Sequence, residues 1–303
     1  MSQLTAIAQK LIDLGGLMSM GMMVNKIQAI VITGNGINCE MELAHACRLG
    51  GADEVEIVHI SRLLSGEVNL SDFHFLNLPG GFVDGDDLGS AKANAARFRY
   101  AETAQGESLF SQIRTFINDG KLILGVCNGF QLLVKLGLVP SLKNDYLSQD
   151  VTLTHNDSGR FEDRWVYLKI NENSPCVFTR GIENVYLPVR HGEGKIVVRD
   201  DDALNEIRGK NLIVAQYSDA SCKAPSYDYP LNPNGSIDAI AGMCDATGRV
   251  FGMMPHAEAY IHYTNHPRWT RGNVPEGGMG VAFFKNCLLY TSPSPRDHLL
   301  HLV

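Results

Sequence analysis

The sequence lacks any unbroken apolar stretch of the roughly 18–20 residues that a membrane-spanning helix needs, so we predict no transmembrane helix. It is also short of basic residues, because 26 Lys and Arg stand against 33 Asp and Glu, for a net charge of −7. This balance argues against a nucleic-acid binder, since phosphate contacts need a basic surface. The seven cysteines show no CxxC spacing, and their odd number argues against a disulfide framework and for a reducing compartment, the cytoplasm.

The HExxH pattern of zinc enzymes and the P-loop are missing as well. His256, His262 and His266 lie close together in the chain, but Pro267 would disrupt a helix that placed the last two one turn apart. Gly34-Asn35-Gly36 begins like a dinucleotide-binding loop, yet the third glycine of that motif is absent. We therefore predict no metal site and no cofactor held by this chain.

What is present is typical of a globular α/β protein. With 45% hydrophobic and 19% charged residues over 303 positions, the chain can bury a large core without disulfides. In the first half, apolar runs alternate with helical patterns, which indicates βαβ units and a mostly parallel sheet. We predict strands at residues 27–32, 55–60, 73–78 and 121–126, and helices at residues 40–49, 91–104 and 130–136.

The second half is rich in strand-like segments with few helices between them. These segments are residues 151–155, 165–170, 185–189, 196–199, 212–217, 237–244 and 250–254. We predict that they form antiparallel additions and the far strands of the same sheet. Because the chain shows no repeat and no linker, we predict a single domain over residues 27–286.

Both ends of the chain differ from this domain. Residues 1–26 contain a cluster of methionines, and we interpret them either as a loose leader helix or as sequence upstream of a natural start at Met22 or Met23. Beyond residue 286, Pro293 and Pro295 exclude a helix and a central strand. We interpret residues 287–303 as a tail of extraneous sequence.

The strongest chemical signal is Gly125-Val126-Cys127-Asn128-Gly129, where an apolar strand runs into a cysteine and a helix begins at once. This is the nucleophile-elbow pattern with Cys in place of Ser, and its glycines permit a strained, closely packed turn. The helix N-terminus favours a thiolate, and the N–H of Asn128 would point at an oxyanion. A buried structural cysteine is the alternative for this motif alone.

A thiolate nucleophile needs a base, and the base needs a group that orients it. His256 directly follows the strand at residues 250–254, and open α/β sheets place their sites at the carboxyl ends of strands. Glu258 stands two residues further on and would accept the imidazole N–H. Taken alone, this pair also fits a surface histidine beside a solvated carboxylate.

A second oxyanion donor should come from another loop. Pro79-Gly80-Gly81-Phe82 follows the strand at residues 73–78, and its glycines let bare N–H groups approach a substrate carbonyl. A simple tight turn is the alternative.

Together these segments resemble the class I, triad-type glutamine amidotransferases, and among them the glutaminase subunits of phosphoribosylformylglycinamidine synthase. The resemblance runs in colinear order over residues 27–286. It rests on Gly-Val-Cys-Asn-Gly-Phe-Gln from residue 125, Leu-Pro-Gly-Gly-Phe from 78, Gly-Asp-Asp-Leu-Gly from 85, Asn-Asp-Ser-Gly-Arg-Phe-Glu from 156, His-Gly-Glu-Gly-Lys from 191 and Met-Pro-His-Ala-Glu from 254. Val83-Asp84 departs from the Ser-Tyr or Ala-Tyr pair usual in that loop, which puts the detail of the loop in doubt.

The resemblance implies a flavodoxin-like open α/β sheet, mostly parallel, with helices on both faces. It implies a catalytic triad, an oxyanion hole and a set of glutamine contacts. The implied triad consists of Cys127 as nucleophile, His256 as general acid and base and Glu258 as orienting carboxylate. The implied oxyanion hole consists of the N–H groups of Gly81 and Asn128. The implied glutamine contacts are Gln131, Asn156, Ser158, Arg160 and Phe161. The loops at residues 85–89 and 191–195 would lie towards a synthetase.

The implied reaction is hydrolysis of glutamine to glutamate and ammonia. The ammonia would pass to a large synthetase subunit, with a small accessory subunit as a further partner, and ATP and magnesium would belong to the synthetase. Two alternatives remain open: a stand-alone Cys–His hydrolase of the same fold, such as a γ-glutamyl hydrolase or a peptidase, and a binding protein with a dead active site.

Overall fold

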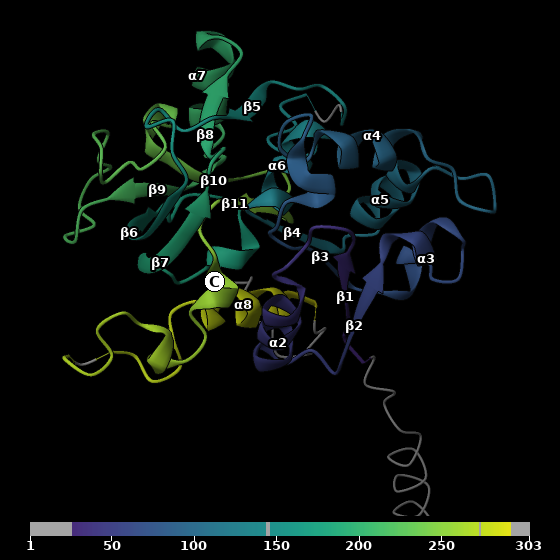
Figure 1. Ribbon diagram of the computed structural model, residues 1–303, viewed down its shortest axis with the longest axis horizontal. Helices are drawn as coiled ribbons and strands as arrows, with labels where there is room; N and C mark the ends of the chain where they lie inside the picture. Colours follow the sequence, from purple (N-terminus) through teal and green to yellow (C-terminus); the bar gives the residue numbers. More distant parts are fainter. Residues whose placement is uncertain (1–25, 144–145, 273, 292–303) are drawn as a thin grey trace, which may run out of the picture.

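The computed structural model describes residues 26–143, 146–272 and 274–291, and a nine-stranded sheet forms its centre (Figure 1). The strand order is β2-β1-β3-β4-β11-β10-β9-β6-β7. In that order the strands are Glu54–His59, Gln28–Thr33, Phe75–Leu78, Leu122–Val126, Val250–Met253, Ile240–Cys244, Ile213–Ser218, Glu162–Ile170 and Asn184–His191. Two further strands, β5 (Val151–Thr154) and β8 (Lys195–Val198), form a separate antiparallel pair.

The first five strands in this order are parallel to one another. Their arrangement, with the first strand of the chain between the second and the third, is the flavodoxin-like order. Strands β3, β4 and β11 are buried along their whole length, as expected for parallel strands covered on both faces. The predicted open α/β sheet of flavodoxin type is therefore confirmed.

Helices cover both faces of the parallel strands (Figure 1). Helices α2 (Glu40–Gly50) and α8 (Val281–Thr291) pack together on one face. Helices α4 (Lys92–Tyr100), α5 (Leu109–Asn118) and α6 (Asn128–Lys135) lie on the other. The short helix α3 (Ile60–Leu64) follows β2, and α7 (Asp201–Gly209) follows β8.

Four of the described helices, α3, α5, α7 and α8, are not among the predicted ones, and α5 and α7 have clear local signals in the chain. Ser108 caps α5 by accepting from the N–H of Ser111, and five apolar side chains of α5 are buried at helical spacing. Asp200 caps α7 in the same way, through the N–H of Ala203. The helical period at residues 201–209 is short and lies between strand-like segments, which hides it in a strand-rich half of the chain.

The antiparallel additions are confirmed for β10, β9, β6 and β7. The prediction that β5 and β8 also join the main sheet is wrong. They pair with each other instead, and β5 lies against helix α6. The alternation of buried residues in β5 gives the strand one apolar face, and this face can pack against a helix as well as against another sheet. The pattern therefore predicted the strand but not its partner.

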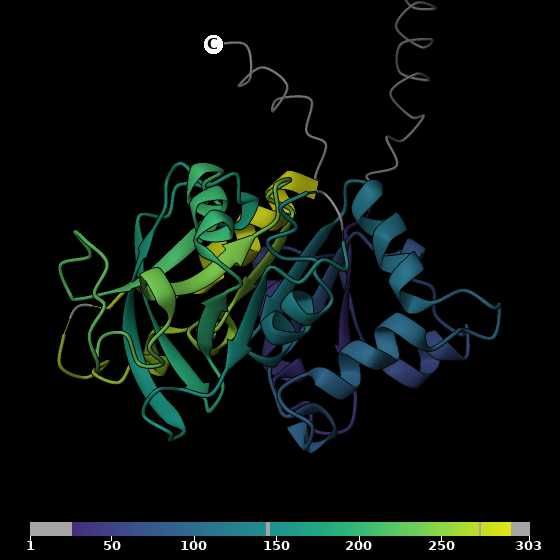
Figure 2. The same ribbon diagram turned by 90° about the horizontal axis from the view of Figure 1, so that it is seen from above.

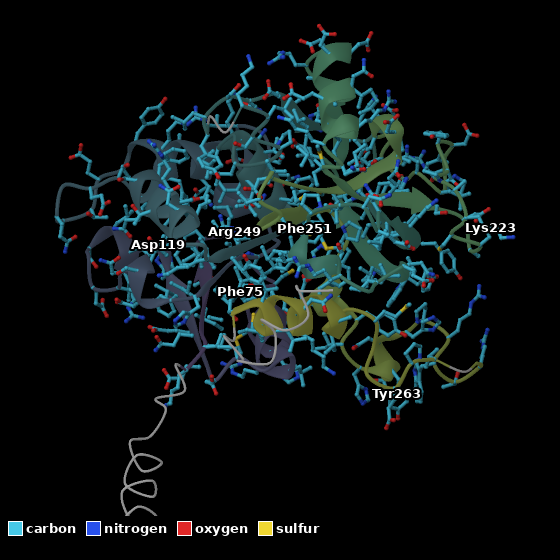
Figure 3. The ribbon with its side chains drawn as sticks, turned by 180° about the vertical axis from the view of Figure 1, so that it is seen from behind. Phe75, Asp119, Lys223, Arg249, Phe251 and Tyr263 are labelled. Carbon is cyan, nitrogen blue, oxygen red and sulfur yellow. The ribbon has the colours of Figure 1, made fainter. Side chains whose placement is uncertain are left out.

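Aromatic rings connect the layers of the core. Phe178 lies 6.0 Å from Phe75 of β3 and 5.5 Å from Phe251 of β11, and Phe251 stacks on Phe283 of α8 at 6.3 Å. Figure 3 shows Phe75 and Phe251 inside the ribbon, whereas Lys223 lies at the tip of the loop between β9 and β10. The earlier and later parts of the chain form the two sides of one body, with the sheet running through both (Figure 2).

Helix α8 continues across the boundary that we placed between residues 286 and 287, so the expectation of no helix beyond residue 286 is wrong for residues 287–291. The side chain of Asn286 donates to the carbonyls of Phe178 and Arg180 at 3.0 and 2.8 Å, and Cys287 and Leu288 are buried. The leader at residues 1–25 and the tail from residue 292 lie outside the described residues. All seven cysteines are free thiols, as their spacing predicted, and no described helix has the length and apolarity needed to cross a bilayer.

Candidate active site

Cys127 lies at the junction of β4 and α6 and is almost fully buried, at 6% exposure. Its backbone has φ +51° and ψ −106°, a conformation that a non-glycine residue rarely adopts and that is typical of a nucleophile elbow. The N–H of Cys127 donates to the carbonyl of Met253 at 2.8 Å, and its carbonyl accepts from the N–H of Gln131 at 3.0 Å. The strain is thus held by hydrogen bonds on both sides.

The glycines of the elbow are required by close packing. A Cβ on Gly129 would stand 1.9 Å from the carbonyl oxygen of Leu78, and one on Gly125 would stand 2.6 Å from the carbonyl oxygen of Gly129. Neither contact is possible without moving backbone. The sequence pattern therefore identified a turn in which helix α6 presses directly on strands β3 and β4.

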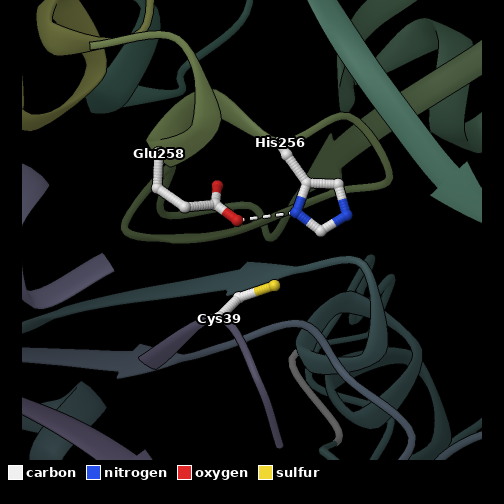
Figure 4. Close-up of side chains that lie close together, drawn as sticks. All are labelled: Cys39, His256 and Glu258. Carbon is white, nitrogen blue, oxygen red and sulfur yellow. Dashed lines mark hydrogen bonds and ion pairs between the residues drawn. The ribbon is translucent and has the colours of Figure 1, made fainter. Parts of the chain in front are cut away.

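His256 follows β11, the neighbour of β4, so the two predicted catalytic side chains leave adjacent strand ends. Its Nδ1 lies 2.6 Å from Oε1 of Glu258, and both side chains are buried (Figure 4). Burial alone would lower the pKa of His256. The charge of Glu258 and the hydrogen bonds that a protonated His256 can donate to Cys127 and Cys39 outweigh it and raise the pKa well above its ordinary value.

Gly80 marks the point at which these groups meet. A Cβ on Gly80 would stand 2.8 Å from Cε1 of His256, and 3.4 Å from both Cβ of Cys127 and Sγ of Cys39. Because Glu258 occupies Nδ1 of His256, Nε2 is the nitrogen that is available to a thiol, and it has no hydrogen-bond partner among the described residues. This arrangement is the one that the predicted triad of nucleophile, base and orienting carboxylate requires.

The two predicted oxyanion donors lie on either side of this point. The N–H groups of Gly81 and Asn128 find no acceptor within the described part of the chain. Gly81 has φ +149° and is held against the first loop, where the N–H of Phe82 donates to the carbonyl of Gly36 at 2.7 Å. Gly36 must be glycine, since a Cβ would lie 2.0 Å from the carbonyl oxygen of Phe82. The Gly34–Gly36 loop therefore supports Gly81.

The residues expected to contact glutamine divide into two groups. Gln131 and Asn156 are buried, and their amides already bond within the chain. Nε2 of Gln131 donates to the carbonyl of Glu193 at 2.6 Å. Ser158, Arg160 and Phe161 lie at the surface instead: Ser158 and Arg160 line a hollow beside Tyr227 and Tyr229, and Phe161 is 53% exposed.

Asn156 holds the loop at residues 191–194 in place. Its Oδ1 accepts from Nδ1 of His191 at 3.2 Å and from the N–H of Gly194 at 3.0 Å. Its Nδ2 donates to the carbonyls of Arg160 and His191. Burial and the positive charge of His256 lower the pKa of His191 to about 4, so this second histidine of the site is neutral at pH 7.

Sequence reasoning missed the main-chain atoms that strand β7 contributes. The carbonyl of Pro188 accepts from the N–H of His256 at 2.8 Å, and the carbonyl of Arg190 lies 3.6 Å from Sγ of Cys127. No signal in the sequence could have found them, because every residue has a carbonyl. These contacts show that β7, although it is the last strand in the sheet order, lies against Cys127 and His256.

Cys39 was missed as well, although it lies in a loop after a strand's carboxyl end, where such residues are expected. Its Sγ, a nitrogen of His256 and an oxygen of Glu258 lie within 4.8 Å of one another, close enough to ligate a metal ion (Figure 4). A metal ligated by both Nδ1 and Oε1 would have to replace the 2.6 Å hydrogen bond between them. His262 and His266 do not join it.

Comparisons with known proteins agree with this geometry. Residues 26–291 match the model of the CobB/CobQ-like glutamine amidotransferase domain. The chain is 41% identical to phosphoribosylformylglycinamidine synthase subunit PurQ of Dehalococcoides mccartyi, over 87% of this chain and 97% of that protein. It is 38% identical to phosphoribosylformylglycinamidine synthase of Drosophila melanogaster, over 77% of this chain but only 17% of that protein.

Among solved structures, the chain is similar to one in the structure of PurLQS from Thermotoga maritima. The two share 29% of their residues with a TM-score of 0.63, over 88% of this chain and 99% of the other. The elbow cysteine, the histidine and carboxylate beside it and the matched sequences lead to one conclusion: this chain belongs to the CobB/CobQ-like glutamine amidotransferase domain family.

Proposed function

We propose that this chain is the glutaminase subunit of a phosphoribosylformylglycinamidine synthase. It hydrolyses glutamine to glutamate and ammonia, and the ammonia serves a synthetase that makes formylglycinamidine ribonucleotide in de novo purine biosynthesis. The observation that supports this most strongly is a strained, buried Cys127 beside a hydrogen-bonded His256–Glu258 pair, in a chain 41% identical to such a subunit over nearly its full length.

In this proposal the thiolate of Cys127 attacks the side-chain amide carbon of glutamine. The N–H groups of Gly81 and Asn128 hold the developing oxyanion, and each such donor typically contributes about 10²–10³ in rate. Protonated His256 gives its proton to the departing ammonia, which leaves a γ-glutamyl thioester on Cys127. His256 then takes a proton from water, the water attacks the thioester, and glutamate leaves as the thiol is restored.

The charge of Glu258 suits this cycle. It raises the pKa of His256 and fixes the proton on Nδ1, so that Nε2 faces the thiol. The raised pKa favours an imidazolium beside a thiolate before attack. Gln131 and Asn156 are proposed to shape the glutamine site through the loops that they hold in place. Ser158, Arg160 and Phe161 lie at the surface, in the segment that follows Asn156.

The proposed partners are a large synthetase subunit and a small accessory subunit. The relative from Thermotoga maritima was solved as PurLQS, and the match in Drosophila melanogaster covers only 17% of a much longer synthase chain. Both observations support a glutaminase unit that works with a larger one. ATP and magnesium act in the synthetase, since the described residues of this chain contain no P-loop, and we place the complex in the cytoplasm.

The two alternatives receive less support. A stand-alone Cys–His hydrolase would not be expected to match synthase subunits over nearly their whole length. A dead binding protein would be expected to have lost one of the three catalytic side chains, whereas Cys127, His256 and Glu258 are all present and meet in the structure.

The test is Cys127→Ala, assayed in the assembled complex with its synthetase. We expect glutamine-dependent formation of the amidine to fall by at least about 10³-fold, because the nucleophile is gone. Synthesis from added ammonium should stay unchanged, since that route needs only the synthetase. Glutamine-dependent activity that survives the substitution would refute the proposed function, and activity on glutamine without any synthetase at a similar rate would favour the stand-alone hydrolase.

A further inference from the structure

Beyond the triad, the structure contains a closed ring of hydrogen bonds behind the elbow. Nδ2 of Asn128 donates to both carboxylate oxygens of Asp86 at 3.2 and 3.1 Å, and to Oε1 of Gln131 at 3.0 Å. Nε2 of Gln131 donates to the carbonyl of Glu193 at 2.6 Å. The carboxylate of Glu193 accepts from the N–H of Ser90 at 3.2 Å.

The ring closes through the loop at residues 82–91. The next residue after Ser90, Ala91, donates its N–H to the carboxylate of Asp86 at 2.9 Å. We call this set, Asp86, Ser90-Ala91, Asn128, Gln131 and Glu193, the elbow ring. It joins three segments that are far apart in the sequence: the loop after β3, the first turn of α6 and the loop after β7.

Asp86 is the member that depends most on the ring. It has φ +51°, and its neighbours Asp84 and Ala91 have φ +53° and +54°, so the loop holds three non-glycine residues in the left-handed region. Asp tolerates this region better than most residues. Its carboxylate is half-buried, and both of its oxygens are occupied by donors from elsewhere. A surface loop that needed only a turn would not need a carboxylate turned inward onto Asn128.

The consequence concerns the oxyanion hole. The amide nitrogen Nδ2 of Asn128 is already occupied, because it is shared between Asp86 and Gln131. Its backbone N–H, in contrast, is the proposed oxyanion donor next to Cys127. Fixing the side chain therefore fixes the peptide whose N–H must meet the oxyanion, and a misplacement of about 1 Å at such a group can cost about 10²-fold in rate.

We propose that Asp86 is a positioning residue for glutamine hydrolysis: through the elbow ring it fixes Asn128, and so ties the oxyanion hole to the loops at residues 82–91 and 191–194. This inference rests on the proposed function. It also implies that a movement of either loop would move the oxyanion donor, so that the ring would couple the position of these loops to glutamine hydrolysis.

The electrostatics of the ring agree with this role. Burial and the nearby charge of Glu193 raise the pKa of Asp86, while the N–H of Ala91 and the side chain of Asn128 oppose the rise. Lys135, half-buried on α6, is close enough for the two carboxylates to act on its pKa. The carboxylates of Asp86 and Glu193 therefore lie close to the ammonium group of Lys135, and the removal of one of these charges should weaken the interactions of the other two.

The decisive variants are Asp86→Asn and Asn128→Ala, measured as complexes with the synthetase. Asn suits the left-handed backbone and keeps one acceptor for the N–H of Ala91, but it turns a donor onto Nδ2 of Asn128. Ala at position 128 keeps the backbone N–H and removes the side chain from the ring. We expect both to lower kcat for glutamine about tenfold to 10²-fold, with KM changed less than about threefold.

A second readout separates positioning from general damage. Alkylation of Cys127 by iodoacetamide displaces iodide directly and forms no oxyanion, so it reports the thiolate but not the oxyanion hole. We expect its rate to stay within twofold in both variants while glutamine turnover falls. The matched control is Asp202→Asn, which makes the same change of charge at an exposed side chain of α7 and should leave kcat within twofold.

The outcomes are distinct. If both variants assemble and keep kcat within twofold, or if alkylation falls as much as turnover, the positioning role is refuted. If Cys127→Ala in the same assay retains glutamine-dependent activity, the proposed function fails and the inference fails with it. We expect turnover to fall in both variants with unchanged alkylation, while the activity of Asp202→Asn and ammonium-dependent synthesis remain normal.

Discussion

The parallel and antiparallel parts of the sheet contribute different atoms to the same site. Cys127 and His256 follow the adjacent parallel strands β4 and β11, and the glycines that make room for them follow β3. The antiparallel strand β7 offers main-chain carbonyls instead, from Pro188 to the N–H of His256 and from Arg190 to the thiol of Cys127.

This difference predicts which substitutions should reduce activity and which should reduce stability. Side chains at parallel strand ends perform the proposed chemistry, so their loss should reduce kcat. The antiparallel part holds these groups in place through its backbone and through Asn156, so changes there should reduce stability first and activity second. Four substitutions test this division, taken from the largest expected effect on activity to the smallest.

Glu258→Gln should have the largest effect. Glutamine keeps the shape of the side chain but not the charge that raises the pKa of His256, and it no longer fixes the proton on Nδ1. Since an Asp→Asn change in the serine protease triad lowers kcat about 10⁴-fold, we expect a fall of about 10³-fold here. Steady-state kinetics of the complex measure it, and a loss of less than tenfold would show that Glu258 does not orient the base.

The same variant predicts a change in pH dependence. A histidine whose pKa is raised on folding stabilises the protein fully below its unfolded pKa of about 6.5, and this stabilisation is lost as pH rises through the raised value. The stability difference between wild type and Glu258→Gln should therefore be largest below about pH 6.5 and should shrink in alkali. Urea unfolding over a pH series measures this difference, and a constant value would contradict the prediction.

Gly80→Ala should come next, because its Cβ would lie 2.8 Å from Cε1 of His256. The imidazole must shift, and we expect kcat to fall about tenfold to 10²-fold while the fold is retained. Gly209→Ala is the matched control, since nothing lies within 4 Å of a Cβ there and alanine suits the helix. Equal kinetics for the two variants would mean that His256 has room that the structure does not show.

Asn156→Ala tests the antiparallel part. It removes four hydrogen bonds and leaves Nδ1 of His191 and the N–H of Gly194 without their acceptor. Each buried unsatisfied group costs about 1–3 kcal/mol, so we expect unfolding free energy to fall by at least about 2 kcal/mol and kcat by no more than about tenfold. Chemical denaturation and kinetics report both, with the exposed Asn173→Ala as control. A large kcat loss at unchanged stability would instead favour direct contact with glutamine.

His191→Gln should affect activity least, by about threefold or less, and its signature is in acid. The unfolded chain protonates His191 near pH 6.5, but the folded chain does so only near its lowered pKa of about 4. Stability is therefore lost as pH falls between these values, by on the order of 3 kcal/mol. The variant should flatten this part of the pH–stability curve, and an unchanged slope would show that His191 is not the group responsible.

Sequence patterns predicted the parallel strands and the candidate triad, because both depend on local signals. The elbow motif spans five consecutive residues, Gly125–Gly129, and His256 and Glu258 are two residues apart after an apolar strand. The patterns failed for β5 and β8, where a buried face indicated a strand but not its partner. They also missed helix α7, Cys39 and the elbow ring, whose members lie up to 107 positions apart in the chain.

By itself the sequence determined which chemistry is available: a cysteine that only a glycine-flanked turn can present, and a histidine paired with a carboxylate. Only the tertiary structure decided how that chemistry is held in place. The N–H of His256 meets the carbonyl of Pro188, and the side chain of Asn128 meets Asp86, because strands and loops distant in sequence pack side by side. A carbonyl is identical in every residue, so no pattern of side chains can predict which one a catalytic group will find.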